Sequence, residues 1–196
     1  KPQLEIIRKW IAQGVDFGTW EGATDGIEKF ASRNKKAVYI PPHLQFYDDL
    51  AKGLKPLPGK TLDGVRQATG ALVRPIGIGS SLLEVRFLAE SVSSGDTELE
   101  SLKPLRQHLA KLDLSRTQVT GKSLAFLATF PRLTDLNLRD TRIGDANLEQ
   151  LGSLRHLRHL NLVGTEVSDA GLPKLAKCKS LRDLYLWSSE VSPRAA

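Results

Sequence analysis

The residues best suited to chemistry in this chain are a histidine and two aspartates at equal intervals. His159 stands midway in the sequence between Asp135 and Asp183. If these positions lie on adjacent strands, the side chains are roughly 4.8 Å apart. An imidazole between two carboxylates can hold a metal ion, since both are common metal ligands. His156 and His159 also form an H-x-x-H pair.

Other features argue against catalysis or metal binding. The spacing of the apolar residues places His156 at a turn and His159 on a strand, so the two are not expected to bind one metal ion together. The pattern predicts no nucleophile, no pocket and no cover on the strand face. The stretch GIGSS at 77–81 lacks the lysine and following helix of a phosphate-binding loop. Mixed charges also suit a solvated sheet face. We therefore expect no enzyme, no metal site and no cofactor in this chain.

Cys178 is the only cysteine. A single cysteine excludes an internal disulfide and a two-cysteine haem attachment within the chain. It occupies the repeat position held by Phe130 and Leu154 in earlier copies. We therefore expect a buried, apolar side chain rather than a reactive thiol.

The interval of 24 residues from Asp135 to His159 is the period of a repeated sequence motif. LAKLDLSRT at 109–117, LTDLNLRDT at 133–141 and LRHLNLVGT at 157–165 share leucine at positions 1, 4 and 6 and threonine at position 9. A fourth copy begins at Leu181, and a looser copy begins at Leu82. The three leucines predict a short strand with one buried face. Apolar residues at positions 16, 19 and 22 predict a helix after it.

One strand and one helix cannot bury their apolar sides alone, whereas stacked copies share a continuous core and a parallel sheet. Thr120 and Ser168 are suitable residues to start the helices of two copies. The hydroxyl at position 9 is expected to bond to backbone groups of the turn. Aligned hydroxyls of this kind are also expected to tie neighbouring copies together.

These residues resemble the leucine-rich repeat family. The pattern L-x-x-L-x-L-x-x-T-x-V/I with a helical second half covers 109–191 tightly and 82–108 loosely. The family's usual asparagine at position 9 is Thr or Ser here, which resembles short-helix bacterial versions. The resemblance implies an α/β solenoid over 82–196, with a parallel strand face and a helical convex side. It also implies a non-catalytic module that binds a protein partner on the strand face.

The residues that vary between copies, at positions 3, 5 and 7, are expected to point outward from the strand face. The candidate partner-binding residues are Lys111, Asp113, Asp135, Asn137, Arg139, His159, Asn161, Val163, Asp183, Tyr185 and Trp187. Aromatic residues among adjustable polar neighbours are typical of binding hot spots, which favours the end that carries Tyr185 and Trp187. The alternative is that these two rings pack under the last residues and close the end of the stack.

Residues 1–81 lack the repeat. Residues 1–20 predict a helix over 4–14 and an extended tail, and 21–60 predict a linker or irregular segment, with a short strand ended by Pro41 and Pro42. Residues 61–81 predict a short helix that stops at Gly70 and a strand around 72–76. We interpret 61–81 as a degenerate repeat that caps the solenoid, because open ends of a stack need covering.

The segment IRKWIAQGVDFGTW at 7–20 carries a second resemblance. It is similar to the last helix and exit of c-type cytochrome domains in proteins of planctomycete-like bacteria, where a linker and Thr-type leucine-rich repeats follow. The match covers about residues 4–20, and the Cys-x-x-Cys-His motif is absent, so no residue here receives a haem role. The resemblance implies a longer parent protein that is periplasmic or otherwise exported. The alternative function is the C-terminal part of a haem c electron-transfer protein, with the haem domain upstream.

Composition bears on the remaining classes of partner. The net charge is +6 without a basic stripe, so a nucleic-acid partner is not expected. No apolar run reaches the roughly 20 residues that span a bilayer, and no membrane contact is expected from this segment. The chain has no methionine, and we expect it to be part of a longer protein.

Overall fold

The computed structural model describes residues 42–88 and 95–192. The predicted helix over 4–14, the tail after it and the segment that resembles a cytochrome exit lie outside these residues. In chain order the described elements are α3 (Pro42–Ala51), α4 (Gly59–Thr69), β1 (Leu72–Pro75), β2 (Leu83–Arg86), α5 (Asp96–Leu99), η2 (Glu100–Leu105), β3 (Leu109–Asp113), α6 (Gly121–Leu127), β4 (Asp135–Asn137), η3 (Leu148–Ser153), β5 (His159–Asn161), η4 (Leu172–Lys177) and β6 (Asp183–Tyr185).

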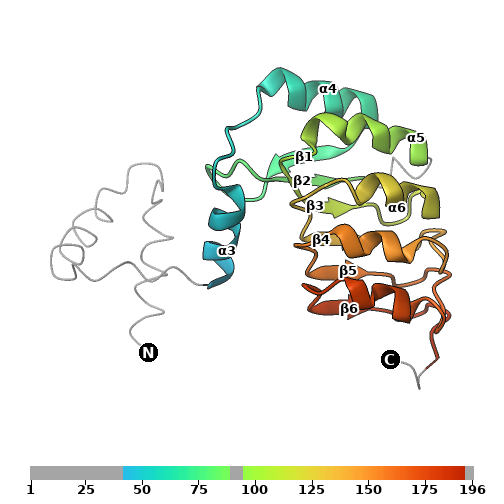
Figure 1. Cartoon of the computed structure of the whole chain (residues 1–196). Helices are drawn as coiled ribbons and strands as arrows, with labels where there is room; N and C mark the ends of the chain where they lie inside the picture. Colours follow the sequence, from blue (N-terminus) through green and yellow to red (C-terminus); the bar gives the residue numbers. More distant parts are fainter. Residues whose placement is uncertain (1–41, 89–94, 193–196) are drawn as a thin grey trace, which may run out of the picture. The chain divides into compact units, whose positions relative to one another are not determined.

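The strands form one six-stranded sheet in sequence order, from β1 to β6 (Figure 1). All pairs from β2 onward are parallel. Leu112 pairs with Leu136, which pairs with Leu160, which pairs with Leu184. The interval predicted from the sequence is therefore the register of the sheet, and equivalent residues of successive copies are neighbours.

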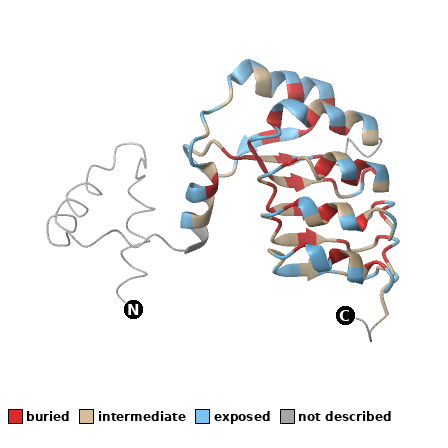
Figure 2. Cartoon of the chain, viewed as in Figure 1, coloured by how far each residue is buried: buried red, intermediate tan, exposed pale blue. Residues whose placement is uncertain are grey.

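The core lies between the sheet and the helical segments, which pack side by side in chain order, α6 on η3 and η3 on η4. The leucines that the repeat predicts to be inside are inside: Leu133 and Leu138 are fully buried and Leu136 is 1% exposed. Figure 2 shows buried residues both in the strands and in the helical segments. Cys178 is also buried, as predicted, and its burial raises the pKa of the thiol.

The helical second halves of the regular copies are shorter and tighter than the apolar pattern predicts. Among them only α6 is an α-helix, and the Thr120 hydroxyl accepts a hydrogen bond from the Lys122 backbone at its start. The corresponding segments η3 and η4 are 3₁₀ helices of 6 residues each. Ser168 does not begin a helix, because η4 starts only at Leu172. A short repeat leaves little chain for this segment, and 3₁₀ geometry spans more length per residue than an α-helix.

The segment before the repeats contains both elements predicted over 61–81. Helix α4 ends at Gly70, whose φ of 65° is the left-handed conformation that glycine adopts at helix ends. Strand β1 then pairs with β2 in antiparallel orientation. The connection between β1 and β2 is a short turn, and parallel pairing would need a much longer crossover.

The prediction of an irregular segment over 21–60 is wrong for the part that the structure describes, because that part contains helical residues. Helix α3 occupies Pro42–Ala51, and α4 begins at Gly59. The predicted short strand that ends at Pro41 and Pro42 lies outside the described residues. Proline is equally suited to the first turn of a helix, where no backbone N–H partner is needed, and Pro42 is the first residue of α3.

The hydroxyls at position 9 fulfil half of their predicted role. Thr117, Thr141 and Thr165 are buried, and each donates a hydrogen bond of 2.6–2.7 Å to the backbone carbonyl of the leucine at position 6 of its own copy. These bonds hold the turn that follows each strand. They stay within one copy, so the prediction that they tie neighbouring copies together is wrong.

Aspartates beyond the turn join the copies instead. Asp145 accepts hydrogen bonds from the Ser168 backbone at 2.8 Å and from its hydroxyl at 2.5 Å. Asp96 accepts the same two bonds from Thr120, and Asp169 accepts them from Ser192. Each aspartate therefore satisfies the backbone of the next copy in the stack.

Leu136 and Leu184 hold the same repeat position in different surroundings. Leu136 lies between two neighbouring strands and is 1% exposed, whereas Leu184 on the last described strand is only partly buried. Leu136→Ala is expected to lower the free energy of unfolding by about 2–5 kcal/mol, and Leu184→Ala by clearly less, because less apolar contact is lost. Urea denaturation of both variants checks this. Equal losses would contradict the register.

Asp96 predicts a pH-dependent contribution to stability. Partial burial alone would raise the pKa of Asp96, but hydrogen bonds from Ser123 and Thr120 outweigh it and lower the pKa below 3.8. A carboxylate with a lowered pKa stabilises the fold above the unfolded value, and the benefit is lost as pH falls through the folded value.

Asp96→Asn is therefore expected to destabilise the chain by about 1–2 kcal/mol at pH 7, as lost charge-assisted bonds do. The deficit should shrink as pH falls below about 4, because the unfolded wild-type chain then binds a proton that the folded carboxylate resists. Urea midpoints at pH 7 and pH 3 measure both. Glu100→Gln, at an exposed position nearby, is the control. A deficit that does not change with pH would contradict the assignment.

Candidate interaction site on the strand face

The register brings the predicted candidate residues together in rows that cross the strands. Position 3 forms one row, in which Lys111, Asp135, His159 and Asp183 are successive neighbours. Position 5 forms a second row of Asp113, Asn137, Asn161 and Tyr185. None of the eleven candidate residues is buried. Arg139, Val163 and Trp187 follow the strands at position 7, in the turns.

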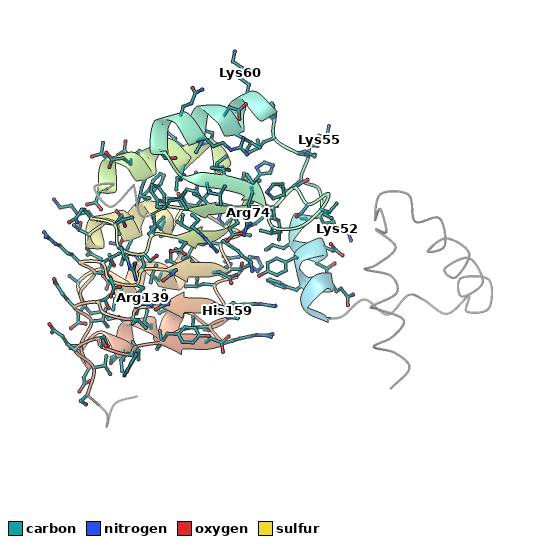
Figure 3. All side chains as sticks on the ribbon, turned by 180° about the vertical axis from the view of Figure 1, so that it is seen from behind. Lys52, Lys55, Lys60, Arg74, Arg139 and His159 are labelled. Atoms are coloured by element: carbon teal, nitrogen blue, oxygen red, sulfur yellow. The ribbon has the colours of Figure 1, made fainter. Side chains whose placement is uncertain are left out.

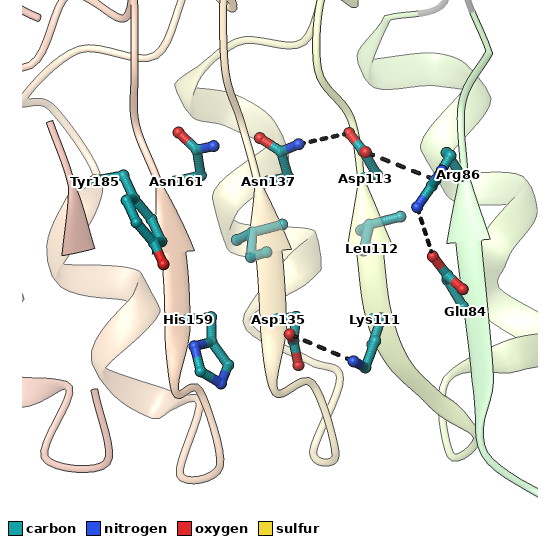
Figure 4. Close-up of a pocket in the computed structure, with 11 residues that line it drawn as sticks. Glu84, Arg86, Lys111, Leu112, Asp113, Asp135, Asn137, His159, Asn161 and Tyr185 are labelled. Atoms are coloured by element: carbon teal, nitrogen blue, oxygen red, sulfur yellow. Dashed lines mark hydrogen bonds and ion pairs between the residues drawn. The ribbon is translucent and has the colours of Figure 1, made fainter. Parts of the chain in front are cut away.

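A shallow hollow of about 290 Å³ lies between the two rows. Leu112 and Leu136 lie at its floor, and side chains from Glu84 and Arg86 at one end to His159 and Tyr185 at the other form its sides (Figure 4). The prediction that this face has no pocket is wrong. Long side chains at positions 3 and 5 stand up from the sheet, whereas position 4 points into the core and leaves the space between the rows open.

Ion pairs link most charges along the hollow. Arg86 lies 3.0 Å from Glu84 and 3.8 Å from Asp113, and Lys111 lies 3.7 Å from Asp135. The row of Asp135, His159 and Asp183 is divided: His159 Nδ1 contacts Asp183 Oδ2 at 2.6 Å, while Asp135 contacts Lys111. Within 42–88 and 95–192, no three His, Cys, Asp or Glu side chains are grouped closely enough to hold a metal ion.

The position-5 side chains have a structural task that sequence reasoning missed. Asp113 Oδ1 accepts a hydrogen bond from the Ser115 backbone at 2.9 Å, and Asn161 Oδ1 accepts one from the Val163 backbone at 3.0 Å. Asn137 does the same for Arg139, and its amide donates to Asp113 at 3.0 Å. Asp or Asn in three consecutive copies was the available signal, since these residues commonly bond to the backbone two residues later.

Helix α3 contributes residues to this site that sequence reasoning also missed. Phe46, Tyr47 and Leu50 pack with Leu82 and Ala110 at the starts of the strands. The Tyr47 hydroxyl donates a hydrogen bond to Asp135 at 3.1 Å. Figure 3 shows α3, which ends one residue before Lys52, beside the sheet that carries His159. The strand face therefore has a wall along one side.

Tyr47 also lies under a cation. The Lys111 ammonium is 5.2 Å from the centroid of the Tyr47 ring, which is within the range of a cation–π contact. Partial burial alone would lower the pKa of Lys111, but Asp135 and Tyr47 together raise it above 10.5. Lys111 therefore stays charged, and its position is set by both neighbours.

The far end of the face exposes two aromatic rings. Tyr185 is 52% exposed and borders the hollow, and Trp187 is 85% exposed. Neither ring packs under the residues that the structure describes up to residue 192, which disfavours the alternative in which they close the stack. Large exposed apolar groups are worth explaining in a small protein, because they usually mark a contact surface.

Comparison with known proteins points to one family. A family model described as Leucine Rich repeat matches residues 153–176, a stretch that contains β5 and most of η4. This match, together with a mixed α/β architecture and a sheet of mostly parallel strands, supports a leucine-rich repeat protein. No curated protein matches the chain. No helix within the described residues has the length and apolar character needed to cross a membrane.

Proposed function

We propose that this chain is a non-catalytic protein-interaction module whose repeats form a solenoid with its binding surface on the strand face. Helix α4 and strand β1 act as its N-terminal cap. The partner contacts the two rows of position-3 and position-5 side chains and the aromatic end at Tyr185 and Trp187.

The observation that carries this proposal is the exposure of Trp187. At 85% exposed, its ring contributes little to the core of this chain. Tryptophan and tyrosine dominate binding hot spots because they bury a large area with few rotatable bonds. Tyr185 connects Trp187 to the hollow, so one partner can reach both.

The polar groups of the hollow suit recognition better than catalysis. Asp113 and Asn137 are bound to the backbone of their own turns, and His159 is held by Asp183. Such groups present fixed charges and amides to a partner. A general base needs a reacting group within hydrogen-bond reach and a nucleophile or water that it activates, and nothing in this row supplies one.

The exposed aromatic end yields a binding test. Trp187→Ala and Tyr185→Ala are expected to lose a specific partner without loss of stability, because their rings lie outside the core. Affinity capture from an extract of the source cells, followed by mass spectrometry, measures which proteins depend on each ring. Ile78→Ala is the matched control, since Ile78 is an exposed apolar residue in the turn between β1 and β2. If no protein depends on Trp187, or Ile78→Ala has the same effect, the proposal fails.

We further propose that the parent is a larger exported bacterial protein with a haem c domain upstream. The support is the segment at 7–20 that resembles a cytochrome exit. In that setting the repeats would position the haem domain against a redox partner. This chain would supply contacts rather than haem ligands.

The haem proposal is tested on the parent protein. Expression in a host that attaches haem c is expected to give a sharp reduced-state absorption spectrum. A parent without haem would remove both the electron-transfer alternative and the argument for export. The interaction module would still stand, since it depends on the strand face.

A further inference from the structure

Four arginines lie at the starts of the last three strands and make no ion pair among the described residues. They are Arg132 before β4, Arg155 and Arg158 before β5, and Arg182 before β6. Every charge pair within 4.0 Å in the described part of the chain involves other basic side chains, such as Lys111 or Arg86. We call these four residues the arginine edge.

The register stacks two of these charges on adjacent strands. Arg158 and Arg182 hold the same position in consecutive copies, and the Arg182 backbone N–H donates to the Arg158 carbonyl at 2.8 Å. Arg132 holds the same position as His156 of the next copy, so this pair adds a histidine and not a second arginine to the edge. Like charges on adjacent strands destabilise a sheet. The arrangement therefore leaves a positive edge that an anionic partner would stabilise.

The local electrostatics agree with this geometry. Burial, followed by the charges of Arg132, Arg158 and Arg155, lowers the pKa of His156. Burial and the charge of Arg182 also lower the pKa of Arg158. Tyr47 and Asp135 act on the pKa of Arg158 in the opposite direction but do not outweigh burial and Arg182.

A hollow of about 390 Å³ adjoins the arginine edge between α3 and the strand starts. Phe46, Leu50 and Pro131 provide its apolar side, and Arg132 and His156 border it.

Two of the four guanidinium groups are held in place before any partner arrives. The Phe46 ring stacks on Arg158, whose guanidinium carbon lies 3.1 Å from the ring centroid. Arg132 is held by hydrogen bonds to the Leu50 and Gln107 carbonyls. A partner that binds these groups therefore has less side-chain freedom to restrict.

We propose that the arginine edge binds an acidic segment of a partner protein, with carboxylates on Arg155, Arg158 and Arg182 and an aliphatic side chain in the hollow beside Phe46. A guanidinium presents paired N–H donors that match a carboxylate in geometry. This surface is separate from Trp187 and Tyr185, so its test does not depend on the strand-face proposal.

The surroundings favour a peptide over a nucleic acid. Asp49 lines the hollow, and Asp183 follows Arg182 directly in the chain. A continuous polyanion would meet both carboxylates. A peptide can place neutral or apolar residues opposite them and its acidic residues opposite the arginines.

The test is a fluorescence-anisotropy titration of the full chain with a labelled peptide, GEELEELEG, and with its glutamine counterpart, GQQLQQLQG. The acidic peptide is expected to bind and to weaken as salt rises, because exposed charges are screened. The glutamine peptide should bind at least about tenfold more weakly, as lost charge-assisted hydrogen bonds imply. Equal binding of the two peptides, or no binding of the acidic one, overturns the proposal.

Variants locate the binding surface. Arg155→Glu/Arg182→Glu changes two exposed arginines of the edge and should weaken the acidic peptide by about tenfold or more. Lys122→Glu/Arg142→Glu makes the same change of charge at exposed positions outside the edge and should leave binding unchanged. An equal loss in both variants would mean general attraction to a basic protein and would overturn the site. Tighter binding of a short single-stranded DNA, lost in the same edge variant, would overturn the assignment to a peptide.

Discussion

Very short strands cannot bury their leucines alone, and the rest of the structure depends on how stacking solves this. Leu160 is fully buried because copies lie on both sides of it, whereas Leu184 on the last described strand is only partly buried. Stability in such a stack comes from contacts between neighbouring copies. Copies of different length can still share this register: the copy that begins at Leu82 is 27 residues long, and its Val85 pairs with Leu112.

The same register that aligns leucines also aligns surface residues, with a different energetic result. In the core, a column of like residues is favourable because apolar contact accumulates. On the surface, a column of like charges is unfavourable, and the row of Lys111, Asp135, His159 and Asp183 avoids this by alternating in character. At the arginine edge, Arg158 and Arg182 stand at the same position of adjacent copies and do not alternate in charge. That contrast within one sheet is the physical reason to assign the edge to an anionic partner.

Much of the polar variation between copies serves the backbone. Turns between stacked elements leave N–H and C=O groups that must be paired when they are buried. Position 5 pairs the turn after the strand, position 9 pairs the carbonyl of the last leucine, and Asp145 pairs the next copy. This aspartate–serine pair is absent between the copies that begin at Leu109 and Leu133. There Gly121 stands at the aspartate position and Gly144 at the serine position. Lengths and turns are thereby maintained while the remaining positions are free to contact a partner.

The leucine period alone determined the strands from β2 onward, their register, the inward and outward faces and the burial of Cys178, because these depend on spacing that is local and repeated. The stop of α4 at Gly70 was also local, since glycine readily adopts a left-handed backbone. Helix α3, the bond from Tyr47 to Asp135 and the separation of His159 from Asp135 were decided by tertiary structure. Tyr47 and Asp135 are 88 residues apart, and no local pattern encodes which outward row a non-repeating helix will contact. The sequence alone shows arginine at positions 132, 155, 158 and 182. Only the fold revealed that these positive charges lie together without carboxylate partners among the described residues.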